Sequence, residues 1–289
     1  MTSSLRSLYT DPTRTLEVLR EFIQQSDERQ VIINWLKNAL TQFVEAARKH
    51  EEVRVLGIGS GSGEVDRCVL HQLVSKYSRV YNRVIEPDKM QINSYRKLIR
   101  SDSELASVEF DFRQQTSDQY LESSCNNKSS SRFDIIHMIQ VLYYVDDIEN
   151  TILQLYDTHL NENGVMIIIH VSGSRAWYRF NKRYENTLPV FRHDNSTGLD
   201  IEAVLEKHHI KYQRTILPSY LIIDECFNKD SQVGRLVFDY ITETNHTVDT
   251  APNDLLQDLM QYLKSPDCSY LREDRRVFEN DLDVFWIHK

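Results

Sequence analysis

The sequence predicts an α/β protein built on a doubly wound, mostly parallel sheet. Between residues 53 and 171, short apolar segments of strand length alternate with longer segments of helical periodicity. A helical crossover returns the chain to the same end of a sheet, so strands joined in this way pair in parallel. With 40% hydrophobic and 27% charged residues and only 8 glycines and 6 prolines, the composition is that of a globular protein rather than a disordered chain.

The first part of the chain is predicted to be helical. Asp11-Pro12 starts the first helix, because Asp is a favoured N-cap and Pro fits the first helical position. Apolar residues then recur at helical spacing at Leu16, Leu19, Phe22 and Ile23. A second amphipathic helix is predicted over Glu28–Lys49.

The alternating part supplies most of the predicted sheet. Strands rich in apolar residues are predicted at Val53–Ile58, Tyr81–Glu86, Val108–Phe112, Phe133–Ile139 and Val165–Val171. Helices are predicted between them at Glu64–Tyr77, Asp88–Arg100 and Asp147–Leu160. The segment Asn161-Glu-Asn-Gly164 is predicted to close the last of these helices, and the polar segment Ser123–Ser131 to form a loop between strands.

Beyond Gly173 the alternation becomes less regular. Helices are predicted at Trp177–Asn186, Leu199–His208, Gln232–Thr244 and Asn253–Leu263. Two further strands are predicted at Lys211–Leu217 and Leu282–Ile287, and a flexible connection at Val190–Gly198.

Charge and cysteine usage argue against several classes of protein. A net charge of −9 disfavours nucleic acid or an anionic membrane as the main partner, because both are bound mostly through Lys and Arg; it is compatible with a small cationic ligand. The four cysteines lie far apart with no Cys-x-x-Cys, which predicts reduced thiols and neither a disulfide framework nor a zinc site. We see no apolar signal core and no apolar run of membrane-spanning length, so we expect a soluble, cytoplasmic protein.

A cluster of glycines stands where the first predicted strand passes into a helix. The cluster consists of Gly57, Gly59, Gly61 and Gly63. Glycine lets the backbone approach a ligand closely, and the helix start beyond it supplies free N–H groups. The dinucleotide spacing Gly-x-Gly-x-x-Gly does not fit, because Ser62 and Glu64 occupy its third position in the two possible frames. The alternative to a ligand loop is a tight turn with no ligand.

Glu86 is the acidic partner expected for this loop. It closes the second predicted strand and is followed by Pro87. Ligands of open α/β sheets bind at the carboxyl edge of the strands, where an acid can accept both hydroxyls of a ribose. Alone, such an acid would be read as a solvated residue or a helix cap; together with the glycine loop it predicts a ribose contact.

The loop resembles that of the seven-strand S-adenosylmethionine-dependent methyltransferases, which contacts the amino-acid end of that cofactor. Further segments resemble the histamine N-methyltransferase family in register over almost the whole chain. They are Ser3–Tyr9, Phe133–Val145, Val171–Ser174, Asp239–Thr244, Thr250–Pro252 and Phe278–Asn280. The resemblance implies a Rossmann-like seven-strand sheet in a monomeric, cytoplasmic enzyme that methylates an imidazole nitrogen of histamine without a metal.

The resemblance also implies a division of the chain. Residues 1–50 would form N-terminal helices that cover the active site, and 51–172 the S-adenosylmethionine-binding core. Residues 173–289 would complete the core sheet and add the substrate-binding region.

Cofactor residues follow from the resemblance position by position. They are Gly59, Gly61, Gly63, Glu86, Gln91, Ser117 and Ile139. Taken singly, Ser117 could instead be a helix cap and Ile139 part of the core. Gly57 departs from the superfamily, which often has an acid at that position, so one hydrogen-bonding side chain is missing.

Substrate residues follow in the same way. They are Glu28, Gln140, Asn280, Tyr143, Tyr144, Tyr9, Trp177 and Tyr240. Glu28 would hold an ammonium group, although without the resemblance it would be read as an ordinary first-turn helix acid. Gln140 and Asn280 offer both donors and acceptors and could select one imidazole tautomer, and the two adjacent tyrosines could wall the ring.

Departures from the family gather in the amine pocket. Thr15, Leu19, Asn181, Leu188 and Asp194 stand where the family has aromatic residues or a cysteine, and Tyr240 replaces a phenylalanine. The pattern therefore leaves three possibilities open: methylation of histamine, methylation of another small biogenic amine or imidazole compound, and a non-catalytic S-adenosylmethionine-binding protein.

We assign no catalytic acid or base. A neutral imidazole nitrogen already carries a lone pair at pH 7, so the protein mainly needs to supply proximity and alignment, with S-adenosylhomocysteine as the second product. His137, inside an apolar strand, is expected to be a core histidine.

Overall fold

The computed structural model describes residues 5–46, 52–125, 131–189 and 196–289. The chain divides into two compact units, each assembled from separate stretches of sequence. Unit 1 comprises residues 1–31, 171–199 and 216–282, and unit 2 comprises residues 32–170, 200–215 and 283–289. No helix among the described residues has the length and apolar character needed to cross a membrane.

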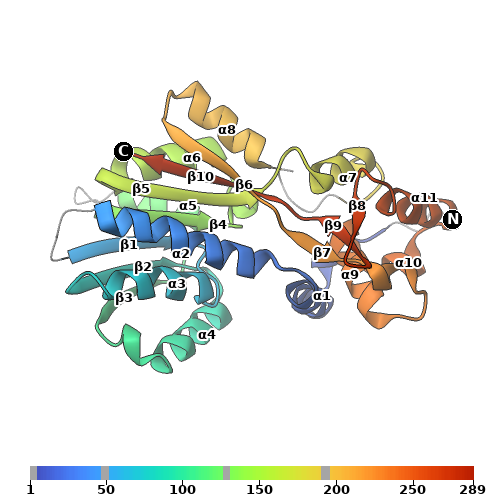
Figure 1. The fold of residues 1–289 in the computed structure, drawn as a ribbon, viewed down its shortest axis with the longest axis horizontal. Coiled ribbons are helices and arrows are strands. Elements are labelled where there is room, and N and C mark those ends of the chain that lie inside the picture. Colours follow the sequence, from blue (N-terminus) through green and yellow to red (C-terminus); the bar gives the residue numbers. More distant parts are fainter. Residues whose placement is uncertain (1–4, 47–51, 126–130, 190–195) are drawn as a thin grey trace. The chain divides into compact units, whose positions relative to one another are not determined.

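A seven-stranded sheet in the order β3-β2-β1-β4-β5-β10-β6 is the main feature of the fold (Figure 1). Its strands are β1 Glu52–Ile58, β2 Arg79–Ile85, β3 Val108–Arg113, β4 Phe133–Ile139, β5 Leu160–Val171, β6 Tyr212–Leu217 and β10 Leu282–His288. The first five pair in parallel, and the order reverses direction between β1 and β4. The predicted doubly wound, mostly parallel sheet is confirmed.

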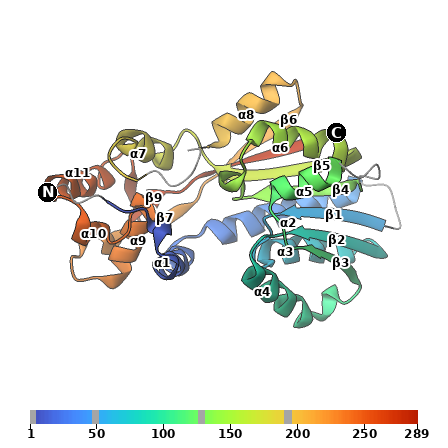
Figure 2. The same cartoon turned by 180° about the vertical axis from the view of Figure 1, so that it is seen from behind.

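Helices cover both faces of this sheet, α2 and α3 on one and α5 and α6 on the other (Figures 1 and 2). The helices are α2 Glu28–Ala46, α3 Glu64–Val74, α4 Lys89–Arg100, α5 Ser117–Cys125, α6 Ile148–Gln154 and α8 Gly198–Lys207. Buried aliphatic side chains of β1, β4 and β5, such as Leu56, Ile136 and Ile168, form the core that they enclose. Burial of strands on both faces explains their nearly continuous apolar sequences.

Unit 1 has its own core and a small antiparallel sheet in the order β7-β9-β8. Its elements include α1 Pro12–Gln25, α7 Ala176–Tyr184, β7 Tyr220–Ile222, α9 Gln232–Thr242, α10 Thr247–Thr250, α11 Asn253–Leu263, β8 Ser269–Arg272 and β9 Arg275–Glu279. Asp11 caps α1 as predicted, accepting the N–H groups of the second and third helical residues. A buried ion pair, 2.7 Å between Arg14 Nη2 and Asp239 Oδ2, ties α1 to α9.

Three predicted local features are wrong. The Asn161–Gly164 turn does not separate a helix from a strand: it lies inside β5, where Asn163 has φ +68° and the pairing with β4 shifts register. The chain absorbs the extra residues as a bulge. Helix α6 ends at Gln154 and continues as a π turn over Leu155–His159. Helix α3 ends at Val74, three residues before the predicted Tyr77.

Other elements were not predicted. Ser123–Ser131 was expected to be a loop, but its first three residues belong to helix α5. Residues 126–130 lie outside the described residues. Helix α5 starts with a capping box, in which Thr116 N donates to Gln119 Oε1 and Gln119 N donates to Thr116 Oγ1. The β7-β9-β8 sheet was missed because its strands have only three to five residues.

The two units do not coincide with the three contiguous segments expected from the sequence. The boundary inside residues 1–50 falls between Val31 and Ile32, within α2. Residues 173–289 contribute to both units, since β6 and β10 complete the large sheet while most of the remainder builds unit 1.

Candidate functional site

The carboxyl edge of the large sheet brings the predicted cofactor residues to neighbouring strand ends. Ile58 at the end of β1 pairs with Ile85 of β2 and with Met138 of β4. The next residues along these strands are Gly59, Glu86 and, one residue further, Gln140. This edge, at the reversal of strand order between β1 and β4, is where ligands of doubly wound sheets bind.

The three glycines of the loop have different surroundings. A Cβ on Gly59 would lie 2.3 Å from Val141 Cγ2, and a Cβ on Gly63 would lie 2.2 Å from the Tyr95 ring. Both therefore permit close packing inside unit 2. Gly61 also has positive φ, but no atom lies within 4 Å of the position of its Cβ. Gly61 is thus the point at which the loop is open to a ligand.

Glu86 is bonded to the loop itself. Its Oε2 accepts the N–H of Gly61 at 2.9 Å, and its Oε1 accepts the N–H of Asp88 at 2.9 Å. Each carboxylate oxygen keeps a second lone pair for a ligand hydroxyl. Burial raises the pKa of the Glu86 carboxyl above its ordinary value, while the two backbone N–H groups oppose the rise.

A buried polar cluster that we did not predict lies beneath the loop. It consists of Asp66, Asn82, Tyr95 and His137, all almost fully buried in unit 2. Tyr95 Oη donates to Asp66 Oδ2 at 3.0 Å, and His137 Nε2 lies 3.4 Å from Asp66 Oδ1. Burial raises the pKa of the Tyr95 phenol well above 10, and the neighbouring Asp66 charge adds to the rise. His137 is therefore buried as expected, but as part of a polar cluster.

This cluster accounts for the glycine at position 57. A Cβ there would lie 2.9 Å from Asp66 Oδ2, 2.9 Å from His137 Cε1 and 2.3 Å from Ser60 Oγ. The space that an acid at position 57 would need is thus already filled by Asp66 and its neighbours. The sequence could place Asp66 in the first turn of a helix. That its side chain points into the core depends on packing, which the sequence pattern does not show.

The remaining predicted cofactor residues also lie at element ends of unit 2. Gln91 is in the first turn of α4 and half-buried, and Ile139 is the last residue of β4. Ser117 is the first residue of α5 and is 8% exposed. Because Thr116 makes the cap bond, Ser117 is not the helix cap.

The predicted substrate residues divide between the two units. In unit 2, Gln140 has the left-handed φ of +52°, and its Oε1 accepts the Tyr143 hydroxyl at 2.6 Å. The Tyr143 ring lies 4.1 Å from the His170 ring, centroid to centroid, and meets Tyr144 edge-on. Tyr143 is buried and Tyr144 is 60% exposed. A left-handed non-glycine residue of this kind is often found at functional sites.

In unit 1, Glu28 and Asn280 are directly bonded. Asn280 Nδ2 donates to Glu28 Oε2 at 2.8 Å and to Ser219 Oγ at 3.3 Å. Asn280 Oδ1 accepts the indole N–H of Trp177 at 2.5 Å. Asn280 is only 2% exposed, and its amide donates to the half-buried Glu28 carboxylate.

Aromatic residues surround this pair in unit 1. Tyr240 stacks on Phe22 at 4.1 Å between ring centroids, and Trp177 meets both Tyr240 and Phe278 edge-on. Tyr9 packs with Tyr240 against a small cluster around Leu8. Phe22 and Phe278 were not among the predicted site residues, because from the sequence they belong to ordinary apolar patterns.

The residues that differ from the family in the expected amine pocket have different surroundings. Thr15 Oγ1 donates to the carbonyl of Leu8 at 3.0 Å, and Leu19 is partly exposed on α1. Asn181 and Leu188 line a small hollow of about 20 Å³ together with Glu243. Asp194 lies outside the described residues.

The loop has the features expected for S-adenosylmethionine. Ser60 Oγ is buried beside the glycines and has no hydrogen-bond partner among the described residues, and the open side of Gly61 faces no protein atom. These groups suit the polar amino-acid end of the cofactor, and Glu86 suits its ribose. Within the described ranges, no group of three or more His, Cys, Asp or Glu side chains is arranged to hold a metal ion.

Comparisons with known proteins identify the family of this chain. A methyltransferase domain family matches residues 27–215. Histamine N-methyltransferase of Cavia porcellus is 35% identical, over 99% of this chain and 99% of the relative. The Bos taurus enzyme is 35% identical over 98% of both chains, and the Danio rerio enzyme 28% identical over 99% of both.

Solved structures show the same fold. The YcgJ protein of Bacillus subtilis, at 14% identity, superposes with a TM-score of 0.53 over 87% of this chain and 98% of its own. The plantazolicin methyltransferase BpumL in complex with SAH, also at 14% identity, gives 0.50 over 97% of this chain and 92% of its own.

Fold, loop and sequence matches together define an S-adenosylmethionine-dependent methyltransferase that acts on nitrogen. Within that class, the chain belongs to the histamine N-methyltransferase family.

The Glu86 carboxylate should decide cofactor affinity. In Glu86→Gln the shape is kept but an acceptor of the ribose and of Gly61 N–H is lost, so we expect S-adenosylmethionine to bind about tenfold to a hundredfold more weakly, since a hydrogen bond to a charged group contributes roughly 1.5–3 kcal/mol. Calorimetric titration measures this. Glu109→Gln, at an exposed position on β3, is the matched control. Unchanged affinity in Glu86→Gln would place the ribose elsewhere.

Asp66 should act on cofactor binding through the loop. In Asp66→Asn the side chain keeps its size, but the Tyr95 hydroxyl loses a charged acceptor, so we expect roughly tenfold weaker S-adenosylmethionine binding. Affinity is to be measured by calorimetry alongside the thermal unfolding midpoint. A lower midpoint with unaltered affinity of the folded protein would make Asp66 purely structural.

Proposed function

We propose that this protein transfers a methyl group from S-adenosylmethionine to histamine, at the imidazole nitrogen far from the side chain. The observation that carries the proposal is the Glu28 carboxylate held by Asn280, a site for an ammonium group. It occurs in a chain whose relatives at 35% identity over nearly full length are histamine N-methyltransferases. A short cationic amine with an imidazole ring suits this charge and the surrounding aromatic residues.

Unit 2 would hold the cofactor. The Gly61 backbone and Ser60 would contact its amino-acid end, Glu86 its ribose, and Gln91, Ser117 and Ile139 its adenosine part. When bound, S-adenosylmethionine supplies a methyl group on a sulfonium, which a nitrogen lone pair can displace in line. S-adenosylhomocysteine is the expected second product, and no metal is needed for this step.

Unit 1 would hold the amine end of the substrate. A charge-assisted hydrogen bond from an ammonium group to Glu28 is stronger than one between neutral groups. Asn280 would act through Glu28, since its amide donates to that carboxylate and is itself oriented by the Trp177 indole and Ser219. Tyr240, Trp177 and Tyr9 would provide aromatic surface for the cation and the ring.

Gln140 would select the reacting nitrogen. The Tyr143 hydroxyl donates to Gln140 Oε1, and that oxygen retains a second lone pair. If it accepts the N–H of the ring nitrogen near the side chain, the far nitrogen keeps its lone pair for the methyl group. No residue is then required as a general base, and alignment can contribute on the order of 7–11 kcal/mol to lowering the barrier.

A second candidate is methylation of another small biogenic amine or imidazole compound. Asn181 and Leu188, which replace aromatic residues of the family, line a hollow with Glu185 and Glu243, so this part of unit 1 is less apolar than an aromatic box would be. In either case we propose a cytoplasmic monomer that acts on a free small molecule and needs neither nucleic acid nor a membrane.

Histamine should be the best substrate in a panel of biogenic amines and imidazole compounds assayed with labelled S-adenosylmethionine. NMR of the product should place the methyl group on the ring nitrogen far from the side chain. Faster turnover of another panel member would overturn histamine as the substrate but leave the reaction class intact. Cofactor binding without turnover of any amine would instead indicate a non-catalytic binding protein.

Glu28 should govern affinity for the amine and not for the cofactor. In Glu28→Gln we expect KM for histamine to rise about tenfold or more, because a charged hydrogen bond becomes a neutral one, with the cofactor affinity unchanged. Steady-state kinetics and calorimetry give the two numbers. Glu21→Gln, on α1 in the same unit, serves as the control. An unaltered KM in Glu28→Gln would mean that Glu28 is an ordinary solvated acid in the first turn of its helix and does not bind the amine.

A further inference from the structure

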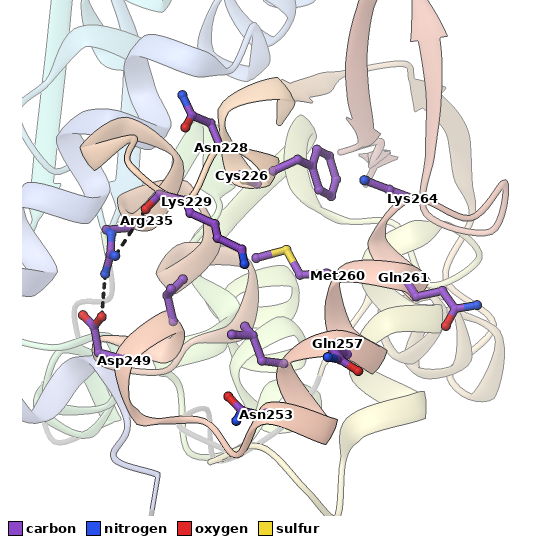
Figure 3. Close-up of a pocket in the computed structure, with 13 residues that line it drawn as sticks. Cys226, Asn228, Lys229, Arg235, Asp249, Asn253, Gln257, Met260, Gln261 and Lys264 are labelled. Carbon is purple, nitrogen blue, oxygen red and sulfur yellow. Dashed lines mark hydrogen bonds and ion pairs between the residues drawn. The ribbon is translucent and has the colours of Figure 1, made fainter.

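Unit 1 contains a cavity that the methyl-transfer reaction does not use. It has a volume of about 730 Å³ and is lined by residues between Cys226 and Lys264 (Figure 3). Its walls come from the short 3-10 helix Asp224–Phe227, the start of α9, and helices α10 and α11. The volume falls in the range of small-molecule sites, roughly 300–1,000 Å³. None of the residues assigned above to cofactor or amine lines it.

The inner wall is apolar. Phe227, Val248, Leu256 and Met260 contribute side chains from three elements, the 3-10 helix Asp224–Phe227, α10 and α11. Cys226 also borders the cavity but is 5% exposed, and burial raises the pKa of its thiol far above the ordinary value. The thiol is therefore protonated at neutral pH, and the cavity suits reversible binding rather than reaction with a nucleophile.

The rim is cationic. Lys229 points towards Met260 in Figure 3, and the Lys264 ammonium lies 4.5 Å from the centroid of the Phe227 ring. Among the described residues, neither lysine makes an ion pair. Arg235 also lines the cavity, but it donates to Asp249, the only acid of the lining, at 2.6 Å.

The charge of the cavity lining and its apolar wall indicate which class of ligand the cavity would bind. Three cations and one carboxylate line the cavity, so its local charge is positive although the whole chain carries −9. A cationic amine such as the proposed substrate would be repelled, whereas an anion would be attracted by two lysines that lack a carboxylate partner. An apolar body on that anion would cover the wall formed by Phe227, Leu256 and Met260.

We propose that this cavity is a second ligand site, which binds a small organic anion with an aromatic or aliphatic body. Lys229 and Lys264 bind the anionic group, and the apolar wall holds the body. This site lies wholly within unit 1 and is independent of the proposed methyl transfer to histamine.

Fluorescence titration of the full chain with anilinonaphthalene sulfonate, an aromatic anion, tests the site. Saturating S-adenosylhomocysteine and histamine are present throughout, so that the methyl-transfer site is occupied. The double variant Lys229→Glu/Lys264→Glu should bind the probe about tenfold more weakly or worse, because two charged contacts become repulsive. Uncharged phenylnaphthylamine should bind both proteins alike. Met260→Trp, which fills the cavity, should abolish binding of either probe.

The matched control is Lys97→Glu/Lys211→Glu, which makes the same change in net charge at two exposed positions of unit 2. It should bind the anionic probe like the parent protein, and all variants should keep the parent unfolding midpoint within a few degrees. Equal probe affinity in the two double variants would overturn the proposal. So would tighter probe binding in a parallel titration without S-adenosylhomocysteine and histamine, or undiminished binding in a folded Met260→Trp variant.

Discussion

The hydrogen bond from Gly61 N–H to Glu86 Oε2 joins the two features on which the cofactor half of the site depends. It connects the loop after β1 to the end of β2, and it is possible only because these parallel strands end in register at one edge. The same edge carries Gln140 at the end of β4. Glu86 thus orders the backbone of the loop, and the proposed ribose contact would use its remaining lone pairs.

Close packing beneath the loop maintains this arrangement. Gly59 lies against Val141 and Gly63 against Tyr95, so two of the three glycines serve contacts within the protein, while the Cβ position of Gly61 is open. The buried Asp66 carboxylate fills the place that a side chain at position 57 would take. Asp66 Oδ2 accepts the Tyr95 hydroxyl, which couples the position of Asp66 to Tyr95 and hence to the loop.

In unit 1, the proposed amine site is built around the Glu28 carboxylate. Glu28 receives the Asn280 amide, which in turn receives the Trp177 indole N–H. This chain of donors fixes the orientation of the carboxylate within unit 1. The rim of the second cavity carries cations instead, so the two sites proposed in unit 1 would favour opposite classes of ligand.

The sequence by itself determined the alternation of strands and helices, the glycine loop and the acid that follows the next strand, because these depend on local periodicity and on short spacings. It also led to the family, since the motifs lie in register along the chain. Only the tertiary structure decided which glycine has an open Cβ position, that Asp66 turns inward, and that Asn280 donates to Glu28. It also decided that Phe22 stacks on Tyr240, 218 positions away in the chain. Such contacts join residues that are distant in sequence, and the direction of each side chain is set by packing, which local patterns do not encode.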